Sequence, residues 1–252
     1  MAEIIRLESV PSTNTWLKTL AQQGAPCGTA VVAREQTAGR GRTGNSFVSE
    51  PGGLYYSYLM DTSFLPLADV TMITSLVAVE AVRALYSAYR ICADIKWVND
   101  ILYHGKKLGG ILVEAGRLTA EGRIPYVVVG IGVNINQRSM PPELKEKVTS
   151  LTIEHGCEWD AEGLLCALSE RFDALAEDLH TPEVLAENFA EYKALCSTVG
   201  SEISFERNGV QETCTAVGID DTCGLMVRYA DGRTETLRSG EIHIRMTAKN
   251  IS

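Results

Sequence analysis

Residues 34–45 read REQTAGRGRTGN, and they follow a short apolar run, AVVA, at residues 30–33. The apolar run is typical of a buried strand that leads into a loop. Glycine has no Cβ, so the backbone of this loop can approach a ligand closely and present its N–H groups. Arginine adds a planar fork of donors that matches carboxylate and phosphate oxygens. These residues alone leave two interpretations open, an anion-binding loop and a solvated surface loop.

The spacing of Gly39, Gly41 and Gly44 also matches a dinucleotide-binding fingerprint, which would imply a nucleotide-binding oxidoreductase. That fingerprint needs a helix that begins at the loop. Here residues 47–53 read FVSEPGG, a run that does not suit the first turns of a helix. The sequence therefore disfavours the oxidoreductase.

The composition is typical of one large globular domain, or of a large domain with a small module. The chain has 252 residues, of which 45% are hydrophobic and 22% charged. A formal net charge of −9 argues against nucleic acid or an anionic membrane as the main partner. Seven scattered cysteines predict a reducing compartment and no zinc site. With no signal-peptide pattern and no apolar stretch of about 20 residues, we expect a cytoplasmic protein without a membrane span.

Hydrophobic periodicity predicts alternating strands and helices over the first 197 residues. The expected strands cover 4–7, 29–34, 54–60, 94–103, 107–114 and 124–136. The expected helices cover 15–23, 67–89, 160–179 and 182–195. The run at 94–103 is expected to form a hairpin with 107–114, and the run at 124–136 can pair with 108–117.

Several polar residues and glycines allow both a structural and a functional interpretation. Ser12 or Thr13 can cap the first helix, and the same side chains could instead hydrogen-bond a ligand. A glycine pair at 109–110 within a strand often marks a close backbone approach. Gly130 and Gly132 are explained equally well by tight sheet packing and by a ligand.

After residue 200 the pattern changes to short strands separated by regular turns. The expected strands cover 202–205, 212–219, 225–229, 233–237 and 241–245. Such a series predicts a small β-barrel. We therefore expect two domains, at residues 1–197 and 198–252.

Several segments together resemble the biotin protein ligases. Residues 36–44 (QTAGRGRTG) resemble the GRGRxG loop of that family, and residues 130–134 (GIGVN) resemble its GIGxN strand. Residues 96–100 (KWVND) and 107–114 (KLGGILVE) resemble its KWPND and KxxGILxE segments. Residues 12–14 (STN) and 240–243 (GEIH) fit as well.

The resemblance implies an α+β fold with a mixed central sheet and flanking helices, similar to class II aminoacyl-tRNA synthetase cores. It also implies a C-terminal SH3-like β-barrel, and the class of ligase without an N-terminal DNA-binding domain. The implied substrates are ATP and biotin, with Mg²⁺. The carboxylate of biotin would attack the α-phosphate of ATP, and a lysine of a biotin carboxyl carrier protein would then attack biotinyl-5′-AMP. The oligomeric state is left open, with a homodimer as one assembly that fits.

The resemblance also assigns residues. The implied catalytic residues are Lys107, Arg40 and Asp100, and Asp100 is the candidate Mg²⁺ contact. The implied biotin-binding residues are Ser12, Thr13, Asn14, Gln36, Gly39, Arg40, Gly41, Arg42, Lys107 and Gly110. The implied ATP-binding residues are Arg40, Arg42, Phe47, Asn99, Asp100, Lys107 and Asn134.

The sequence departs from the family pattern at Asn45, Phe47 and Val98, where the family commonly has Arg, Trp and Pro. Phe47 can still stack on adenine, although its ring face is smaller than that of Trp. The missing positive charge at Asn45 predicts weaker retention of the adenylate.

Two other functions remain compatible with the same core. A lipoate-type ligase would need an apolar dithiolane site, whereas Ser12, Thr13 and Gln36 favour the polar ureido ring of biotin. A non-catalytic biotin or adenylate sensor would not need Lys107, so its presence weighs against a sensor.

Overall fold

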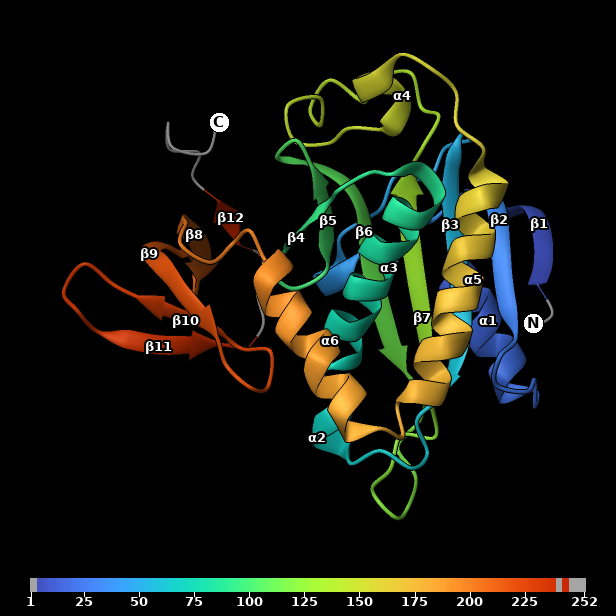
Figure 1. Ribbon diagram of the computed structural model, residues 1–252, viewed down its shortest axis with the longest axis horizontal. Helices are drawn as coiled ribbons and strands as arrows, with labels where there is room; N and C mark the ends of the chain where they lie inside the picture. The colour runs from blue at the N-terminus through green and yellow to red at the C-terminus, as the bar shows by residue number, and fades with distance from the viewer. Residues whose placement is uncertain (1–3, 239–241, 245–252) are drawn as a thin grey trace.

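A mixed β-sheet forms the centre of the computed structural model, which describes residues 4–238 and 242–244 (Figure 1). Within this part of the chain, seven strands lie in the order β1-β2-β3-β7-β6-β5-β4. Their bounds are β1 Ile4–Val10, β2 Ala30–Gln36, β3 Gly53–Asp61, β4 Asp94–Lys96, β5 Asp100–Tyr103, β6 Lys106–Ala115 and β7 Tyr126–Asn134. The strands β1 and β2 are parallel because a helix connects them, and the other neighbours are antiparallel.

Helices cover both faces of this sheet. Their bounds are α1 Thr13–Gln22, α2 Leu67–Val70, α3 Ile73–Tyr89, α4 Leu151–His155, α5 Ala161–Asp178 and α6 Pro182–Leu195. Helix α1 lies on one face, where Leu17 packs in a small cluster with residues of β2, β3 and β7. Helices α3, α5 and α6 lie on the opposite face (Figure 1).

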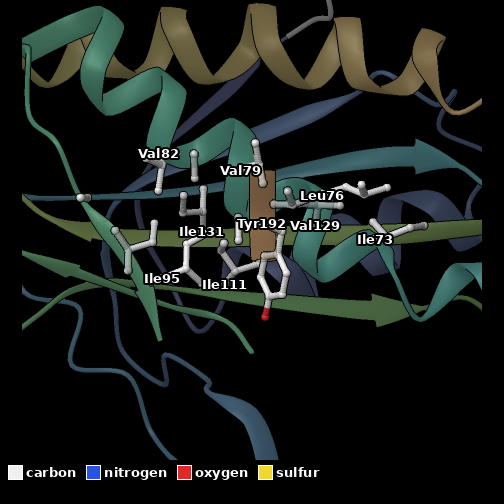
Figure 2. Close-up of a cluster of buried hydrophobic side chains, with 14 of the residues drawn as sticks. Ile73, Leu76, Val79, Val82, Ile95, Ile111, Val129, Ile131 and Tyr192 are labelled. Carbon is white, nitrogen blue, oxygen red and sulfur yellow. The ribbon is translucent and has the colours of Figure 1, made fainter. Parts of the chain in front are cut away.

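The main hydrophobic core fills the space between the sheet and α3. Figure 2 shows side chains from this helix facing side chains of the strands, with a tyrosine of α6 beside them. The labelled residues are Ile73, Leu76, Val79, Val82, Ile95, Ile111, Val129, Ile131 and Tyr192. Successive side chains of a strand point to opposite faces. Because Val129 and Ile131 of β7 face this core, Gly130 and Gly132 face the α1 side.

Two expected elements are each divided in the structure. The helix expected over 67–89 is interrupted after α2, where Thr71 Oγ1 donates to the Ala68 carbonyl at 2.6 Å and competes with helical bonding. The strand expected over 94–103 is a tight hairpin of β4 and β5, because Lys96 pairs with Asp100 and the three residues between them form the turn. Helix α4 was not predicted, since its single turn has only Leu151 buried and carries no periodic pattern.

The C-terminal region forms a small antiparallel sheet in the order β11-β10-β9-β8-β12. Its strands are β8 Glu202–Arg207, β9 Val210–Ile219, β10 Leu225–Arg228, β11 Thr234–Leu237 and β12 His243–Ile244. This sheet lies beside α6 and the β4 edge of the main sheet (Figure 1). Of the strand expected at 241–245, residues 241 and 245 lie outside the described residues, as does Gly240. The expected class, a mixed sheet with flanking helices and a C-terminal SH3-like module, is confirmed.

Candidate active site

A cavity lies beside the N-terminus of α1, between the loop at 37–49, the β4–β5 turn and the strands β6 and β7. The structure brings most of the residues predicted for the site to its wall. Those residues are Ser12, Thr13, Asn14, Gln36, Arg40, Gly41, Arg42, Phe47, Asn99, Asp100, Lys107 and Gly110. The cavity therefore joins segments that are far apart in sequence.

Two residues predicted for the site do not line this cavity. Gly39 lies in a neighbouring groove, and a Cβ there would come within 2.3 Å of the Phe47 carbonyl oxygen. Asn134 is buried, and its Nδ2 donates to the Thr149 carbonyl at 3.0 Å. Both residues thus hold neighbouring backbone in place.

A buried polar group forms the end of the cavity next to α1. Gln36 Oε1 accepts hydrogen bonds from Thr13 N at 2.9 Å and Thr13 Oγ1 at 3.1 Å, and Gln36 Nε2 donates to Ser49 Oγ at 2.8 Å. Ser57 Oγ lies 2.8 Å from Thr13 Oγ1 and donates to Asn14 Oδ1 at 2.6 Å. These side chains have fixed orientations before any ligand enters, as recognition of a polar ring requires.

The capping interpretation of Ser12 is wrong. Ser12 occupies the N-cap position of α1, but its side chain makes no capping hydrogen bond. The hydroxyl of Thr13 likewise bonds to Gln36 and Ser57. The polar residues at this helix start are therefore turned toward the cavity. At the other end, Gly24, with φ +93°, follows the last helical turn.

Two glycines of β7 make room for side chains around the cavity. A Cβ at Gly130 would lie 2.1 Å from Asn14 Oδ1, and a Cβ at Gly132 would lie 2.6 Å from Phe47 Cε1. Gly130 is also the cross-strand partner of Ser57, so Asn14 can lie over the glycine and reach the hydroxyl. Tight packing thus accounts for both glycines.

The other end of the cavity carries an excess of positive charge. Arg40, Arg42, Lys96 and Lys107 line it, and Asp100 is the acidic residue among them. Lys107 Nζ lies 2.6 Å from Asp100 Oδ1, and Lys96 Nζ lies 3.9 Å from Asp100 Oδ2. Because the whole protein has a net charge of −9, this local excess marks a binding site for an anion.

Burial lowers the pKa of one of these cations, Arg42. Its NH1 donates to Asn99 Oδ1 at 3.1 Å, and desolvation lowers the pKa of its guanidinium. Asn99 is held in turn, because its Nδ2 donates to the Ile111 carbonyl at 2.8 Å. An anion that enters beside Arg42 would compensate for this desolvation.

The glycine-rich loop folds back on itself over the cavity. Gly41 N donates to the Asn45 carbonyl at 2.7 Å and Phe47 N donates to the Gly39 carbonyl at 2.9 Å. The Phe47 ring forms part of the wall, 5.8 Å from Lys107 Nζ. This ordered structure, together with the positive charge, supports the anion-binding interpretation over the solvated surface loop.

Sequence reasoning assigned no role to several residues that shape the site. Ser57 is fully buried below Asn14, and Glu114 accepts from Arg40 and Asn14. Lys96 and Ile242 also line the cavity. Ser57 could have been found as the polar residue in an otherwise apolar strand, whereas nothing in the sequence places Ile242 at the site.

Neither a metal cluster nor a membrane helix is found in the part of the chain that the structure describes. Its His, Cys, Asp and Glu side chains form no group of three or more that could hold a metal ion. None of its helices combines the length and apolar character needed to cross a membrane.

A cavity with a polar end and a cationic end, beside a small C-terminal sheet, is the arrangement expected of an enzyme that activates a carboxylic acid with a nucleotide.

Comparison with known proteins agrees with this class. The model of the biotin/lipoate A/B protein ligase family matches residues 7–134, and that of the biotin protein ligase C-terminal domain matches residues 198–245. The bifunctional ligase/repressor BirA of Bacillus subtilis is 34% identical over 236 residues, which cover 91% of this chain and 70% of that protein. The biotin–[acetyl-CoA-carboxylase] ligase of Mycobacterium tuberculosis is 28% identical over 241 residues, which cover 93% of this chain and 86% of that protein.

A solved structure extends the likeness to the whole fold. The biotin protein ligase from Aquifex aeolicus in complex with biotin and ATP has 28% sequence identity and a TM-score of 0.81, and the match covers 98% of this chain and 100% of that one. The chain therefore belongs to the biotin/lipoate A/B protein ligase family and, within it, to the biotin protein ligases.

Proposed function

We propose that this protein joins biotin to ATP to form biotinyl-5′-AMP, with release of pyrophosphate, and then transfers biotin to a lysine of a biotin carboxyl carrier protein, with release of AMP. The observation that carries the proposal is that a buried polar end and a cationic end belong to one cavity. Such a cavity can hold a molecule with a polar ring and a distant carboxylate. Relatives named as biotin–[acetyl-CoA-carboxylase] ligases support the acceptor class, and an acceptor of this kind favours the cytoplasm.

The polar end would bind the ureido ring of biotin. Thr13 and Gln36 present a hydroxyl and an amide whose positions are set by Ser57 and Ser49. Ser12 and Asn14 lie on the same wall. The alternative acid, lipoate, carries an apolar dithiolane ring, which would displace water from this polar wall without offering hydrogen bonds in return. This polar wall is the reason to favour biotin over lipoate.

The cationic end would hold the two reacting groups. The carboxylate of biotin and the α-phosphate of ATP repel each other, so bond formation needs fixed positive charge between them. Lys107 and Arg40 would supply it, with Arg42 beside the phosphates, and the lack of side chains at Gly41 and Gly110 would let a ligand approach the backbone closely. The Phe47 ring would face adenine. Gly39 and Asn134 would act by holding the loop and the end of β7 in shape.

Mg²⁺ fits this site as a companion of ATP. The only acidic side chain on the described wall is Asp100, which already faces two ammonium groups, and Asn99 offers a neighbouring amide oxygen. Mg²⁺ is commonly held by one or two carboxylates together with substrate phosphates, so Asp100 would be its protein contact. The ion would neutralise phosphate charge when bound.

In the second half-reaction, the amine of the acceptor lysine attacks the carbonyl of the mixed anhydride and AMP leaves with the bond electrons. The residues that held the α-phosphate would then stabilise the departing AMP. The described wall has no paired nucleophile and base, so positioning and charge neutralisation are the means of catalysis that it offers.

The proposal is tested by incubating the protein with ATP, Mg²⁺ and either biotin or lipoate, and searching for the adenylate by mass spectrometry. Biotinyl-5′-AMP is expected, with little or no lipoyl-5′-AMP. A preference for lipoate would assign the protein to the other branch of the family. Binding of biotin without formation of any adenylate would indicate a sensor.

A further inference from the structure

Glu114 lies on β6 at the edge of the cavity and has three partners from two other segments. Its Oε1 accepts from Arg40 NH1 at 3.1 Å and lies 3.7 Å from Lys18 Nζ, and its Oε2 accepts from Asn14 Nδ2 at 3.1 Å. The Glu114 side chain is only 14% exposed, whereas that of Arg40 is 52% exposed. A largely buried carboxylate thus anchors a cation that belongs to the exposed loop.

The contact with Asn14 makes Glu114 the end of a continuous hydrogen-bond chain. Asn14 Oδ1 accepts from Ser57, which also contacts Thr13, and Thr13 donates to Gln36 Oε1. Gln36 is the last residue of β2, immediately before the glycine-rich loop. Hydrogen bonds between side chains therefore connect Gln36, at the start of the loop, to Arg40 within it.

This chain explains how Arg40 is held in the absence of a ligand. A guanidinium carries five N–H donors, and the hydrogen bond from Arg40 to Glu114 uses one of the donors on NH1. The remaining donors can bind an anion while Glu114 keeps its own bond. An arginine on a flexible loop loses considerable rotamer entropy when it binds, and a fixed carboxylate removes part of that cost beforehand.

We infer that Glu114 is a positioning residue for substrate binding, which acts by holding Arg40 at the cavity. The inference deepens the proposed function and rests on it for the identity of the anion as the carboxylate of biotin. Glu114 itself does not line the cavity within the part of the chain that the structure describes, so it does not touch the substrate.

The first test is a double-mutant cycle on biotin binding by calorimetry. Glu114→Gln keeps the shape of the side chain but removes its charge, and we expect about tenfold weaker binding, since a charge-assisted hydrogen bond is lost. In an Arg40→Ala background the same change should alter binding less than twofold. Glu114→Asp keeps the charge and should recover part of the affinity. Equal losses in both backgrounds would overturn the inference, because Glu114 would then act independently of Arg40.

The matched control is Glu162→Gln. Glu162 forms an ion pair with Arg6, and both side chains are about half exposed. That change should leave biotin binding unaltered. Thermal unfolding of every variant is measured in parallel. A loss of affinity that follows the unfolding temperature in all variants would indicate a purely structural role and would also overturn the inference.

The second test does not depend on the substrate. Trypsin cleavage between Arg40 and Gly41 in the ligand-free protein, followed by mass spectrometry, reports how firmly Arg40 is held. Glu114→Gln should speed cleavage at this bond several-fold, and Glu162→Gln should not. Unchanged cleavage would overturn the inference whatever the substrate. If Glu114→Gln is cleaved faster but the wild type binds no biotin, the result would support the role of Glu114 in holding Arg40 and would count against the proposed function.

Discussion

Lys107 carries its ammonium group 2.6 Å from Asp100 in a cavity that gathers three further cations. In the proposed reaction it neutralises the charge that collects between the carboxylate and the α-phosphate. Lys107→Ala should therefore reduce biotin-dependent ATP–pyrophosphate exchange by about 10² or more. The control is Lys106→Ala, because Lys106 precedes it on the same strand and lies near the Lys145 carbonyl. Exchange at the wild-type rate in Lys107→Ala would exclude it from the mechanism.

Asn45 lies in the loop that folds over the cavity, where its carbonyl accepts from Gly41 N. The backbone contact does not depend on the side chain, so Asn45→Arg should keep the loop structure and add a positive charge. We expect biotinyl-5′-AMP to dissociate about tenfold more slowly from this variant if one charge-assisted hydrogen bond forms. Release is followed by trapping the free adenylate after filtration, with Asn45→Gln as the uncharged control. Equal release from all three proteins would show that this departure from the family is neutral.

At the scale of the element, the local sequence predicted the helix starts and turns that are stabilised by contacts between residues close in sequence. Helix α5 begins after Asp160, whose side chain accepts from Glu162 N, and α6 begins with Pro182. Gly209, with φ +78°, makes the turn between β8 and β9. The break between α2 and α3 was not predictable in the same way, because the apolar pattern continues across it.

The turn before β10 gives a prediction about pH. Burial opposes ionisation of Asp220, but its carboxylate accepts from Gly224 N and Thr222 N and pairs with Arg238, and together these contacts lower its pKa to about 2. The pKa in the folded protein is thus below the unfolded value of about 3.9. Asp220 therefore contributes stability above about pH 4, and this contribution is lost as the pH falls toward 2.

The measurement is urea unfolding between pH 5 and pH 3. The wild type should lose more free energy of unfolding over this range than Asp220→Asn, which cannot titrate at this position. At pH 5 the variant should be the less stable of the two proteins. Parallel pH profiles would show that the turn makes no pH-dependent contribution.

At the scale of the whole molecule, the C-terminal sheet is joined to the turn that carries the residues expected to bind ATP. Trp97 N donates to Thr198 Oγ1 at 2.9 Å, and Trp97 Nε1 donates to the Cys223 carbonyl at 2.8 Å. Ile242, next to β12, lines the cavity itself. We propose a domain boundary between residues 197 and 198, with the second domain supporting the β4–β5 turn.

Trp97→Phe tests this connection. The variant keeps an aromatic ring but loses the indole N–H, so the buried Cys223 carbonyl loses its donor, at a cost of about 1–3 kcal/mol in the free energy of unfolding. Because Asn99 lies on the same turn, the KM for ATP should rise more than the KM for biotin. Trp16→Phe is the control, since Trp16 is 43% exposed. An equal rise in both KM values would show that the turn is not supported selectively by the second domain.

The sequence by itself determined most of the elements, the fold class and most of the residues on the cavity wall. These properties follow from short-range physics and from motifs: apolar periodicity, capping and turn residues, and glycines with arginines in one loop. The motif-based assignment placed Thr13, Gln36, Arg40 and Lys107 in one site, and the structure brings them to one cavity.

Only the tertiary structure decided which polar residues face the cavity and which hold the backbone. The Thr13 hydroxyl bonds to Gln36, which is 23 residues away, and Glu114 is paired with Arg40, which is 74 residues away. Asn134 lies at the end of β7 but bonds to Thr149 instead of facing the cavity. Contacts between such distant residues depend on strand order and register, which no local pattern specifies. For that reason the sequence assigned no role to Ser57 or Glu114, although both belong to the hydrogen-bond chain beneath the glycine-rich loop.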